Sequence, residues 1–363
     1  MNVDLKFLLR LYGIPKVGPS RIKALIQHFS SYDEIRDASL HHLCSVPGIN
    51  KGIAQLIKSH DTDEFVKQQL KLINRHNVSV ITWWDDKYPE NLKSIHDPPV
   101  LLFIRGNYNR DDRISVAVVG TRNPSSYGKL VTERLCSALV SSGITIVSGL
   151  ARGIDSNAHQ IAVDSGGRTI AVLGSGVDVL YPRENSRLAR RIFERGAVIS
   201  EFPMGTGPDA PNFPRRNRVI AGISLFTLVV EAGKGSGAII TAHYAREYGR
   251  TVFAVPGPIT SRRSTGTNQL ISGGAILVQA PEDILREVEK VVELPGVPRQ
   301  MRMDLDLTEK ERKLFSIFGE EPLHVDFLAR EMRMAPGEML SLLLQLELRS
   351  LIKQLPGKFF VKI

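Results

Sequence analysis

The fold of this chain is decided by the stretch Ile114-Ser115-Val116-Ala117-Val118-Val119-Gly120-Thr121-Arg122-Asn123-Pro124-Ser125. It opens with a short apolar run rich in β-branched side chains, which is typical of a buried strand. A glycine turn then leads into Lys129–Ser142, whose apolar residues recur at helical spacing. Strand, turn and helix in this order form the repeating unit of a parallel α/β sheet.

The same unit repeats on both sides of this stretch, from about Val78 to Val291. Apolar runs predict further strands at Ile144–Ser148, Arg168–Leu173, Ala197–Ser200, Leu225–Val230, Thr251–Val255 and Ala275–Val278. Amphipathic segments predict helices between them at Asn157–Ser165, Asn185–Glu194 and Ala238–Tyr248. We therefore predict an α/β domain over 76–292 with a mostly parallel sheet, helices on both faces, and ligands bound beyond the carboxyl ends of the strands.

The first 75 residues predict a separate domain of short helices joined by tight turns. Two turns are alike: 14–18 precedes the helical pattern of Ser20–His28, and 46–50 precedes that of Lys51–Ser59. This resembles a tandem helix-hairpin-helix (SAM-like) module, in which glycine turns free backbone N–H groups for a phosphate. Each copy keeps one of the two glycines, because Lys16 and Asn50 occupy the other positions. A plain helical packing domain is the equal alternative.

The last part of the chain predicts a small, charge-balanced domain. A proline-containing linker at 293–305 precedes it, and residues 306–363 carry 9 basic and 9 acidic side chains. Helical patterns and a terminal hairpin predict a winged helix, with elements at Leu307–Phe318, Val325–Met332, Pro336–Arg349, Leu351–Pro356 and Phe359–Ile363. Because phosphate neutralisation needs a basic excess, we expect this domain to bind a partner or regulate rather than to grip DNA strongly.

Composition narrows the class of protein. Among 363 residues, 47 Lys+Arg against 38 Asp+Glu give a net charge of +9, which favours a polyanionic partner. The two cysteines, Cys44 and Cys136, stand far apart without a Cys/His cluster, so we expect neither a disulfide framework nor a structural metal. The sequence lacks a long apolar span and a signal-peptide pattern, so we expect a cytoplasmic protein with no membrane partner.

The turn after the first strand is not a dinucleotide fingerprint. Arg122 stands at the second glycine position of Gly-x-Gly-x-x-Gly, where a side chain would block the pyrophosphate. The chain also lacks a Gly-x4-Gly-Lys-Ser/Thr loop for a nucleoside triphosphate. We therefore expect no nucleotide cofactor. What remains is an anion site made of a helix N-terminus, a hydroxyl and an arginine.

Several predicted strand ends supply the same residue types, which is more phosphate-binding capacity than one mononucleotide requires. An extended phosphodiester fits better. The candidate binding residues are Gly120, Thr121, Arg122, Ser148, Gly149, Arg152, Gly174, Ser175, Arg183, Asn212, Phe213, Arg215, Arg216, Asn217 and Arg218.

Phe213 points to an unpaired strand, because an aromatic beside a basic cluster is a platform on which exposed bases stack. The alternative is an ordinary buried aromatic. For the three arginines of 215–218, the alternative is that they pair with Glu201, Glu231 or Asp155 to hold the loops together. We expect at least one of the three to be structural.

These residues also carry a family resemblance. The stretch 81–285 resembles the DprA/Smf family of bacterial DNA-processing proteins, and both flanking domains resemble that family's helical module and winged helix. The resemblance rests on Val119-Gly120-Thr121-Arg122, Ser148-Gly149-Leu150-Ala151-Arg152-Gly153-Ile154-Asp155, Phe213-Pro214-Arg215-Arg216-Asn217-Arg218, Val230-Glu231-Ala232, Ser236-Gly237-Ala238-Ile239-Ile240-Thr241-Ala242 and Ala254-Val255-Pro256-Gly257.

The resemblance implies an extended Rossmann-like domain that forms a homodimer and binds single-stranded DNA without sequence preference. It further implies protection of incoming DNA and loading of the RecA recombinase during natural transformation, with no cofactor and no catalysis. By motif position, the DNA-contacting cations are Arg122 and Arg183, and the stacking ring is Phe213. The glycine loops at Gly120, Gly149 and Gly174 supply backbone contacts.

Two positions depart from the family pattern. Relatives often carry a lysine three residues before the aromatic, where this chain has Ala210, so that contact is lost or taken over by Arg215 or Arg216. Arg183 replaces a usual lysine, which keeps the charge and adds a planar fork.

An enzyme is the rival interpretation. The core also resembles lysine-decarboxylase-like phosphoribohydrolases, which place a catalytic carboxylate at the end of a glycine-rich loop. The corresponding loop, 232–240, has glycines and a hydroxyl but no acid at its end. Acid/base catalysis therefore has no obvious residue, and we expect a binding protein rather than an enzyme, although Glu201 and Glu231 remain possible replacements for the carboxylate.

Overall fold

The computed structural model describes residues 3–291, 309–318, 322–332, 334–348, 352–355 and 357–362. The chain divides into two compact units, Met1–Gly296 and Val297–Ile363. The predicted linker at 293–305 lies outside the described residues. No helix in the described ranges has the length and apolar character needed to span a bilayer.

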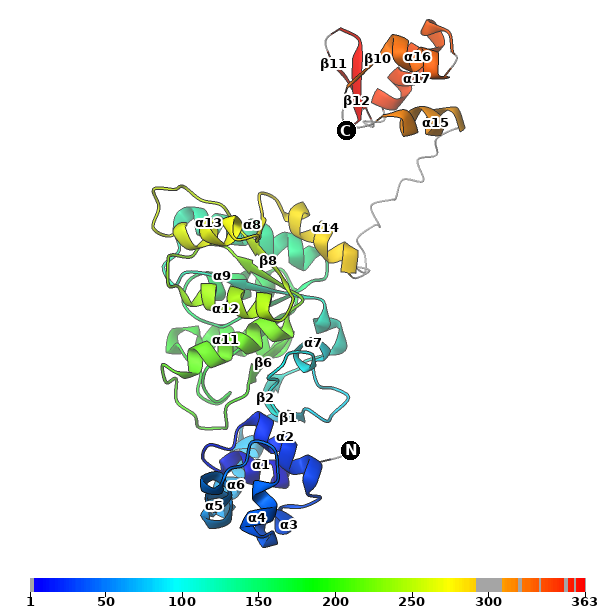
Figure 1. Ribbon diagram of the computed structural model, residues 1–363. Helices are drawn as coiled ribbons and strands as arrows, with labels where there is room; N and C mark the ends of the chain where they lie inside the picture. Colours follow the sequence, from blue (N-terminus) through cyan, green and yellow to red (C-terminus); the bar gives the residue numbers. More distant parts are fainter. Residues whose placement is uncertain are drawn as a thin grey trace. The chain divides into compact units, whose positions relative to one another are not determined.

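The first unit begins with six helices, seen in blue in Figure 1. They are α1 (Leu5–Gly13), α2 (Pro19–His28), α3 (Tyr32–Asp37), α4 (Leu40–Cys44), α5 (Lys51–Ser59) and α6 (Asp63–Arg75). The turns before α2 and α5 have the same form: Lys16 and Gly48 both take positive φ, at 65° and 80°, and Gly18 and Asn50 are the N-caps. The predicted repeat is confirmed, and Lys16 adopts the left-handed conformation that usually favours glycine.

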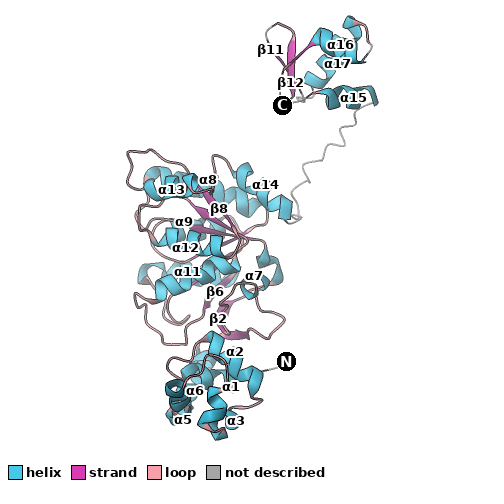
Figure 2. Ribbon diagram, in the orientation of Figure 1, coloured by secondary structure: helices cyan, strands magenta, loops and turns pink. Residues whose placement is uncertain are grey.

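A nine-stranded sheet forms the centre of this unit (Figure 2). Its strands are β1 (Ser79–Thr82), β2 (Leu101–Gly106), β3 (Ser115–Val119), β4 (Thr145–Ser148), β5 (Thr169–Val172), β6 (Ala197–Ser200), β7 (Phe226–Val229), β8 (Thr251–Ala254) and β9 (Ile276–Leu277). The spatial order is β1-β2-β6-β5-β4-β3-β7-β8-β9. Strands β3 to β9 are parallel, as predicted, and the sequence reading missed the antiparallel edge pair β1 and β2.

Helices cover both faces of the sheet because successive residues of each strand point to opposite sides and both sets are apolar. Val118 packs under α8, α9 and α14, whereas Val119 packs under α11, α12 and α13. The helices of this domain are α7 (Glu90–Lys93), α8 (Ser126–Ser141), α9 (Ile154–Asp164), α10 (Ser186–Arg195), α11 (Asn212–Ile223), α12 (Gly237–Glu247), α13 (Thr265–Ser272) and α14 (Pro281–Val291), with short 3-10 turns at Arg110–Arg113 and Arg183–Asn185.

The N-terminal helices are not independent of the sheet. They share one buried apolar cluster with β2 and with the ends of β5 and β6. The Tyr12 hydroxyl donates to the Glu201 carbonyl at 2.6 Å, and the Gln69 amide exchanges two hydrogen bonds, at 3.1 and 2.9 Å, with the backbone of Met204. The first 75 residues therefore pack as part of the same unit as the sheet.

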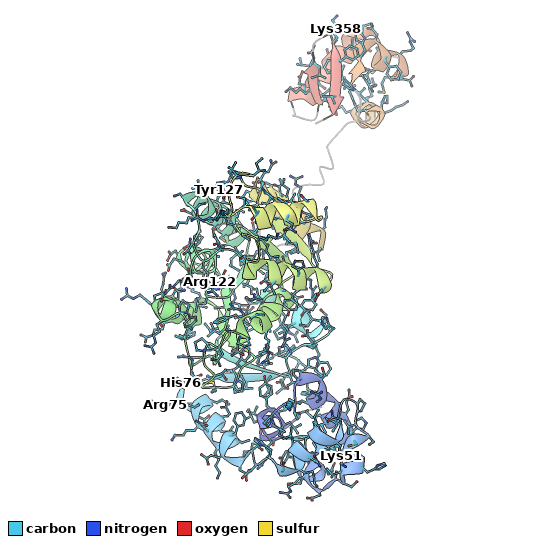
Figure 3. All side chains as sticks on the ribbon, turned by 60° about the vertical axis from the view of Figure 1, so that its left-hand side comes forward. Lys51, Arg75, His76, Arg122, Tyr127 and Lys358 are labelled. Carbon is cyan, nitrogen blue, oxygen red and sulfur yellow. The ribbon has the colours of Figure 1, made fainter. Side chains whose placement is uncertain are left out.

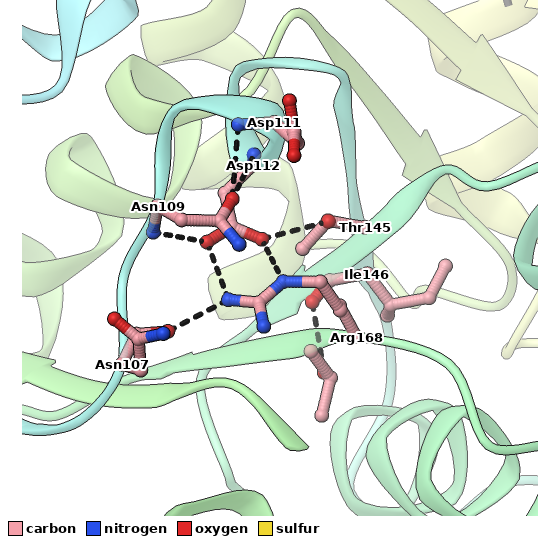
Figure 4. Close-up of polar contacts among 8 residues, drawn as sticks. Asn107, Asn109, Asp111, Asp112, Thr145, Ile146 and Arg168 are labelled. Carbon is pink, nitrogen blue, oxygen red and sulfur yellow. Dashed lines mark hydrogen bonds and ion pairs between the residues drawn. The ribbon is translucent and has the colours of Figure 1, made fainter. Parts of the chain in front are cut away.

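The amino ends of β4 and β5 are held by a buried carboxylate, shown in Figure 4. Asp112 is fully buried and receives two hydrogen bonds from the Arg168 guanidinium, at 2.7 and 2.8 Å, and one from Thr145 at 2.9 Å. A bidentate pair of this kind gives a fixed geometry as well as charge compensation. Arg168 is thus a structural arginine, at the edge of the sheet opposite the carboxyl ends of the strands.

The second unit is a winged helix, as predicted. Its described elements are α15 (Glu309–Ile317), β10 (Leu323–His324), α16 (Val325–Met332), α17 (Pro336–Leu348), β11 (Ile352–Leu355) and β12 (Phe359–Lys362). The strands form an antiparallel sheet in the order β10-β12-β11. Leu328, Leu343 and Phe360 belong to its separate apolar core.

Candidate nucleic-acid interface

The candidate site lies at the point where the strand order of the sheet reverses. From β3 the chain proceeds through β4, β5 and β6 to one side and through β7, β8 and β9 to the other. The loops that follow β3 and β7 must diverge here, and parallel sheets bind ligands in the resulting crevice. The predicted ligand-binding loops, which follow the strands, therefore point to this crevice between β3 and β7 as the site.

Two adjoining cavities occupy this crevice. The larger, of about 460 Å³, lies between the loop after β3 and the loop Gly233–Gly237 after β7. The smaller, of about 200 Å³, is bounded by the loops after β3, β4 and β5. Both are lined by Arg122, Ala151, Phe213 and Arg216, so these residues form the wall between the two cavities.

Phe213 lies at the start of a helix, α11, which was not among the helices predicted from the sequence. It occupies the first turn of α11 and is half-buried. The guanidinium carbons of Arg122 and Arg216 each lie 5.9 Å from the centre of its ring. A Cβ at Gly174 would come within 3.0 Å of the ring, so the glycine allows the ring to lie close to the end of β5. The ring can stack on a ligand and is surrounded by positive charge.

Arg216 belongs to this wall, although only 5% of it is exposed. It donates to the carbonyls of Gly149 and Val172, at 2.6 and 2.5 Å, and burial lowers its pKa to about 10. A Cβ at Gly149 would lie 2.6 Å from the guanidinium carbon, so only glycine leaves room for it. Arg216 thus joins two strand ends while it also lines both cavities, and its contact with a phosphate stays a prediction.

Arg218 is also structural, and its assignment to the binding surface is wrong. Its side chain is 8% exposed and forms a short ion pair with Glu201, which is 1% exposed. It also donates to the Asp97 carbonyl at 2.5 Å, with the Asp97 carboxylate 3.4 Å away. Because its donors are committed inside the protein, it cannot receive a ligand. The prediction that at least one of the three arginines is structural is confirmed.

Four predicted polar contacts hold the loops together instead of facing the cavities freely. The Ser148 and Ser175 hydroxyls are buried and donate to the carbonyls of Val118 and Val179, at 2.6 and 2.7 Å. The side-chain amides of Asn212 and Asn217 are also buried and donate to the carbonyls of Gly207 and Gly237, at 3.4 and 3.1 Å. Ser175 and Asn217 still line the cavities. The sequence showed the right residue types but not that internal carbonyls already use their donors.

The predicted binding arginines that are exposed differ in their partners and in the cavity they line. Arg122, labelled in Figure 3, and Arg183 are exposed and make no ion pair with the described residues. Arg152 is exposed but forms an ion pair with Glu184. Arg215 packs over the Phe202 ring, 5.0 Å from its centre, and lines a different cavity beside the N-terminal helices. Of the predicted binding cations, Arg122 and Arg183 are therefore the two that lie at or beside these cavities, are exposed and have no ion-pair partner among the described residues.

Gly120 and Thr121 line the larger cavity, as predicted. The Thr121 hydroxyl accepts a hydrogen bond from the Asn123 N–H at 3.2 Å, which shapes the turn that carries Arg122. Glu231 accepts from the Ser125 N–H at 2.9 Å and from its hydroxyl at 2.7 Å, just before α8 begins. A carboxylate at this place is stabilised by the helix dipole.

The structure adds two features that sequence reasoning missed. Tyr181 lines the smaller cavity, with its ring centre 6.0 Å from that of Phe213. The loop Gly233–Gly237, which carries the exposed Lys234, lines the larger cavity. Tyr181 could have been found from the sequence, because it is an aromatic residue two positions before Arg183. Across the described residues, no three His, Cys, Asp or Glu side chains are grouped so that they could hold a metal ion.

A buried histidine below the site makes the fold sensitive to acid. His159 is fully buried, its Nδ1 lies 2.7 Å from the Thr169 hydroxyl, and its Nε2 has no partner. Burial lowers its pKa to about 3, from 6.5. The unfolded chain therefore takes up a proton below the ordinary value while the folded chain does not, so the stabilisation is present above that value and is lost as the pH falls.

We predict that this group contributes a slope of about 1.4 kcal/mol per pH unit to the free energy of unfolding. The measurement is urea unfolding of the parent and of His159→Gln at about pH 5.5 and about pH 4.5. The parent should lose about 1.4 kcal/mol more than the variant over that interval. Equal losses would show that His159 is charged in the folded protein.

Three stretches of the chain match known families. Residues 79–289 match the family described as DNA recombination-mediator protein A. Residues 300–358 match the DprA winged helix domain, and residues 8–60 match the SAM-like helix-hairpin-helix tandem.

Individual relatives agree with this result. Protein Smf of Escherichia coli is 40% identical over 301 residues, which cover 81% of this chain and 80% of the relative. DNA processing protein DprA of Streptococcus pneumoniae is 46% identical over 205 residues, covering 56% and 72% of the two chains.

Two solved structures of DprA proteins are also similar to this chain. The Streptococcus pneumoniae DprA structure has a TM-score of 0.67 at 35% identity, covering 79% of this chain and 99% of that one. The Helicobacter pylori DNA processing protein A, whose structure was described for its single-stranded DNA binding mode, has a TM-score of 0.54 at 28% identity over 60% and 97%. A shared central domain, and flanking domains of the matching kinds, place the chain in the DprA/Smf family of DNA recombination-mediator proteins.

Proposed function

We propose that this protein binds single-stranded DNA at the two cavities around Phe213. The observation that carries the proposal is a half-buried aromatic ring with two guanidinium groups near it, at the wall that both cavities share. An unpaired base can stack on such a ring, whereas a duplex hides its base faces. The phosphates on either side would meet Arg122 and Arg183, which have no competing carboxylate among the described residues.

We propose that the site binds without catalysing a reaction. Hydrolysis of a nucleotide would need a free carboxylate, and three candidates are engaged. Glu231 accepts two hydrogen bonds from Ser125, and Glu201 is paired with Arg218. Asp155, which lines the larger cavity, accepts a hydrogen bond from the Gly149 N–H at 3.1 Å. The open cavities and backbone-lined loops suit a strand that is held and passed on. This supports the binding protein over the phosphoribohydrolase-like alternative, and no cofactor is required.

Membership of the family supports the wider role. We propose that the protein acts in the cytoplasm on DNA taken up in natural transformation, protects it, and loads RecA onto it. We also propose that it works as a homodimer, because two sites on one particle would hold a long strand with added avidity.

We predict that Arg122→Ala weakens binding to a short oligothymidine and lowers the salt dependence by about 0.7 in log–log slope, the value for one phosphate contact. Fluorescence anisotropy at two or more salt concentrations measures both quantities. Arg215→Ala is the matched control, because Arg215 is an exposed arginine that does not line the cavities around Phe213. An unchanged slope for Arg122→Ala would remove this residue from the interface.

The function itself is tested by titrating the parent protein with single- and double-stranded oligonucleotides of the same length. A nucleoside monophosphate is added as competitor and checked for turnover. Preference for the single strand without turnover supports the proposal. Turnover of the monophosphate would select the enzyme, and equal affinity for the duplex would exclude stacking on Phe213 as the basis of binding.

A further inference from the structure

Helix α10 carries an exposed stripe of arginines that begins at the rim of the smaller cavity. Arg183 lies in the 3-10 turn before the helix, and Arg187 and Arg190 follow it at intervals of four and three residues. Residues at this spacing lie on one side of a helix. All three are exposed, and Glu194, one turn further on, ends the stripe.

The other side of α10 explains why the stripe faces outward. Leu188, Ala189 and Ile192 are buried in the apolar cluster that covers β5 and β6. At 100° per residue, these side chains lie opposite Arg187 and Arg190. Packing therefore fixes the orientation of the helix, and the arginines cannot turn inward to find partners.

These arginines differ from their neighbours in lacking a partner carboxylate. Arg152 pairs with Glu184, and Arg191 pairs with Asp164. Within the described part of the chain, no ion pair involves Arg187 or Arg190. Burial lowers the pKa of Arg105, and the charge of Arg190 lowers it further against the opposing charge of Asp178, so a half-buried third cation lies near Arg190. Arg187 and Arg190, gathered on one side of the helix with no ion-pair partner among the described residues, suit a polyanion.

The stripe is continuous with the proposed site. Tyr181 lines the smaller cavity and is 46% exposed, and it stands two residues before Arg183. Its ring is 6.0 Å from that of Phe213, with an angle of 46° between the planes. A strand whose base stacks on Phe213 would meet a second aromatic surface at Tyr181 and then the first arginine.

From this continuity we infer that a single strand leaves the smaller cavity past Tyr181 and runs along α10, with its phosphates on Arg187 and Arg190. The inference rests on the proposed function and extends it from a pocket to a path. It assigns to α10 the sequence-independent part of binding, which depends on charge and therefore on salt.

The test compares oligothymidines of about 4 and about 16 nucleotides, the range over which single-strand sites on other folds extend. The double variant Arg187→Ala/Arg190→Ala should bind the short oligonucleotide like the parent. For the long one, its log–log salt slope should be lower by about 1.4, about 0.7 for each arginine. Arg195→Ala is the matched control, because Arg195 is exposed on the same helix but lies off the stripe.

The outcomes separate this inference from the proposed function. If the parent binds both lengths, Phe213→Ala weakens both, and the double variant behaves like the parent with the long oligonucleotide, the path along α10 is wrong while the pocket stands. If the double variant loses affinity equally for both lengths, the two arginines attract the oligonucleotide by long-range charge and do not contact a strand along α10, and the inference is also wrong. If the parent binds neither length, the proposed function itself fails.

Discussion

Arg218→Ala should lower the free energy of unfolding by about 3–5 kcal/mol, the usual cost of breaking a buried ion pair from one side. The variant leaves the Glu201 carboxylate, which is 1% exposed in the parent, without its charge partner. Burial already raises the pKa of Glu201, and Arg218 opposes that rise. Without the arginine the carboxylate must either stay charged in an apolar interior or take up a proton.

The pH dependence gives this prediction a specific signature. A carboxyl whose pKa is raised in the folded state contributes its stability at low pH and loses it as the pH rises through the raised value. The loss caused by Arg218→Ala should thus be smaller at about pH 5 than at about pH 8, as measured by urea unfolding. The double variant Arg218→Met/Glu201→Leu is the control, since replacing both charges by apolar groups should recover most of the stability. A single variant as stable as the parent at both pH values would show that the pair does not hold the domain together.

Phe213→Ala should weaken binding to single-stranded oligothymidine by about 1–3 kcal/mol, which is roughly five- to 150-fold in Kd. The ring is half-buried at the wall between the two cavities, with Arg122 and Arg216 on it. Removing it takes away the aromatic surface on which a base would stack, beside the Arg122 and Arg216 guanidiniums. Anisotropy titration against the parent measures the loss.

Two further variants separate stacking from packing. Phe213→Tyr keeps an aromatic face and should bind within about threefold of the parent, whereas Phe213→Leu keeps apolar bulk without a π-face and should bind like Phe213→Ala. Thermal unfolding of all three checks that the fold is retained. If leucine restores full affinity, the side chain serves packing, and base stacking occurs elsewhere.

Much of the fold was predictable because it rests on local pattern. The run that ends at Val119 is apolar on both of its faces, which is the mark of a parallel strand covered by helices. The likeness of the turns at 14–18 and 46–50 was also visible in the sequence, and the two turns share the same backbone form. Strands β1 and β2 were missed because β2 joins the sheet by antiparallel pairing with β6, about a hundred residues away in the chain, and β1 in turn pairs with β2.

The site was predictable as a set of strand ends but not as an arrangement of donors. An arginine in sequence is equally suited to a phosphate and to a buried carboxylate. Arg216 and Arg218 stand two positions apart on α11, yet one reaches the carbonyls under the cavities and the other reaches Glu201 and Asp97. Residues two apart on a helix point about 200° away from each other, so the discovery that this segment is helical reassigns both.

The sequence by itself determined the class of fold, the family and the edge of the sheet where a ligand binds. Periodicity, glycine turns and the position of Arg122 are local properties, so they can be recognised in the sequence without knowledge of any distant contact. Only the tertiary structure decided which cations are free. An arginine is available to a ligand when no carboxylate of the protein pairs with it, and such carboxylates come from segments that are distant in the sequence. Glu201 pairs with Arg218 and Glu184 with Arg152, whereas Arg122 has no ion-pair partner among the described residues.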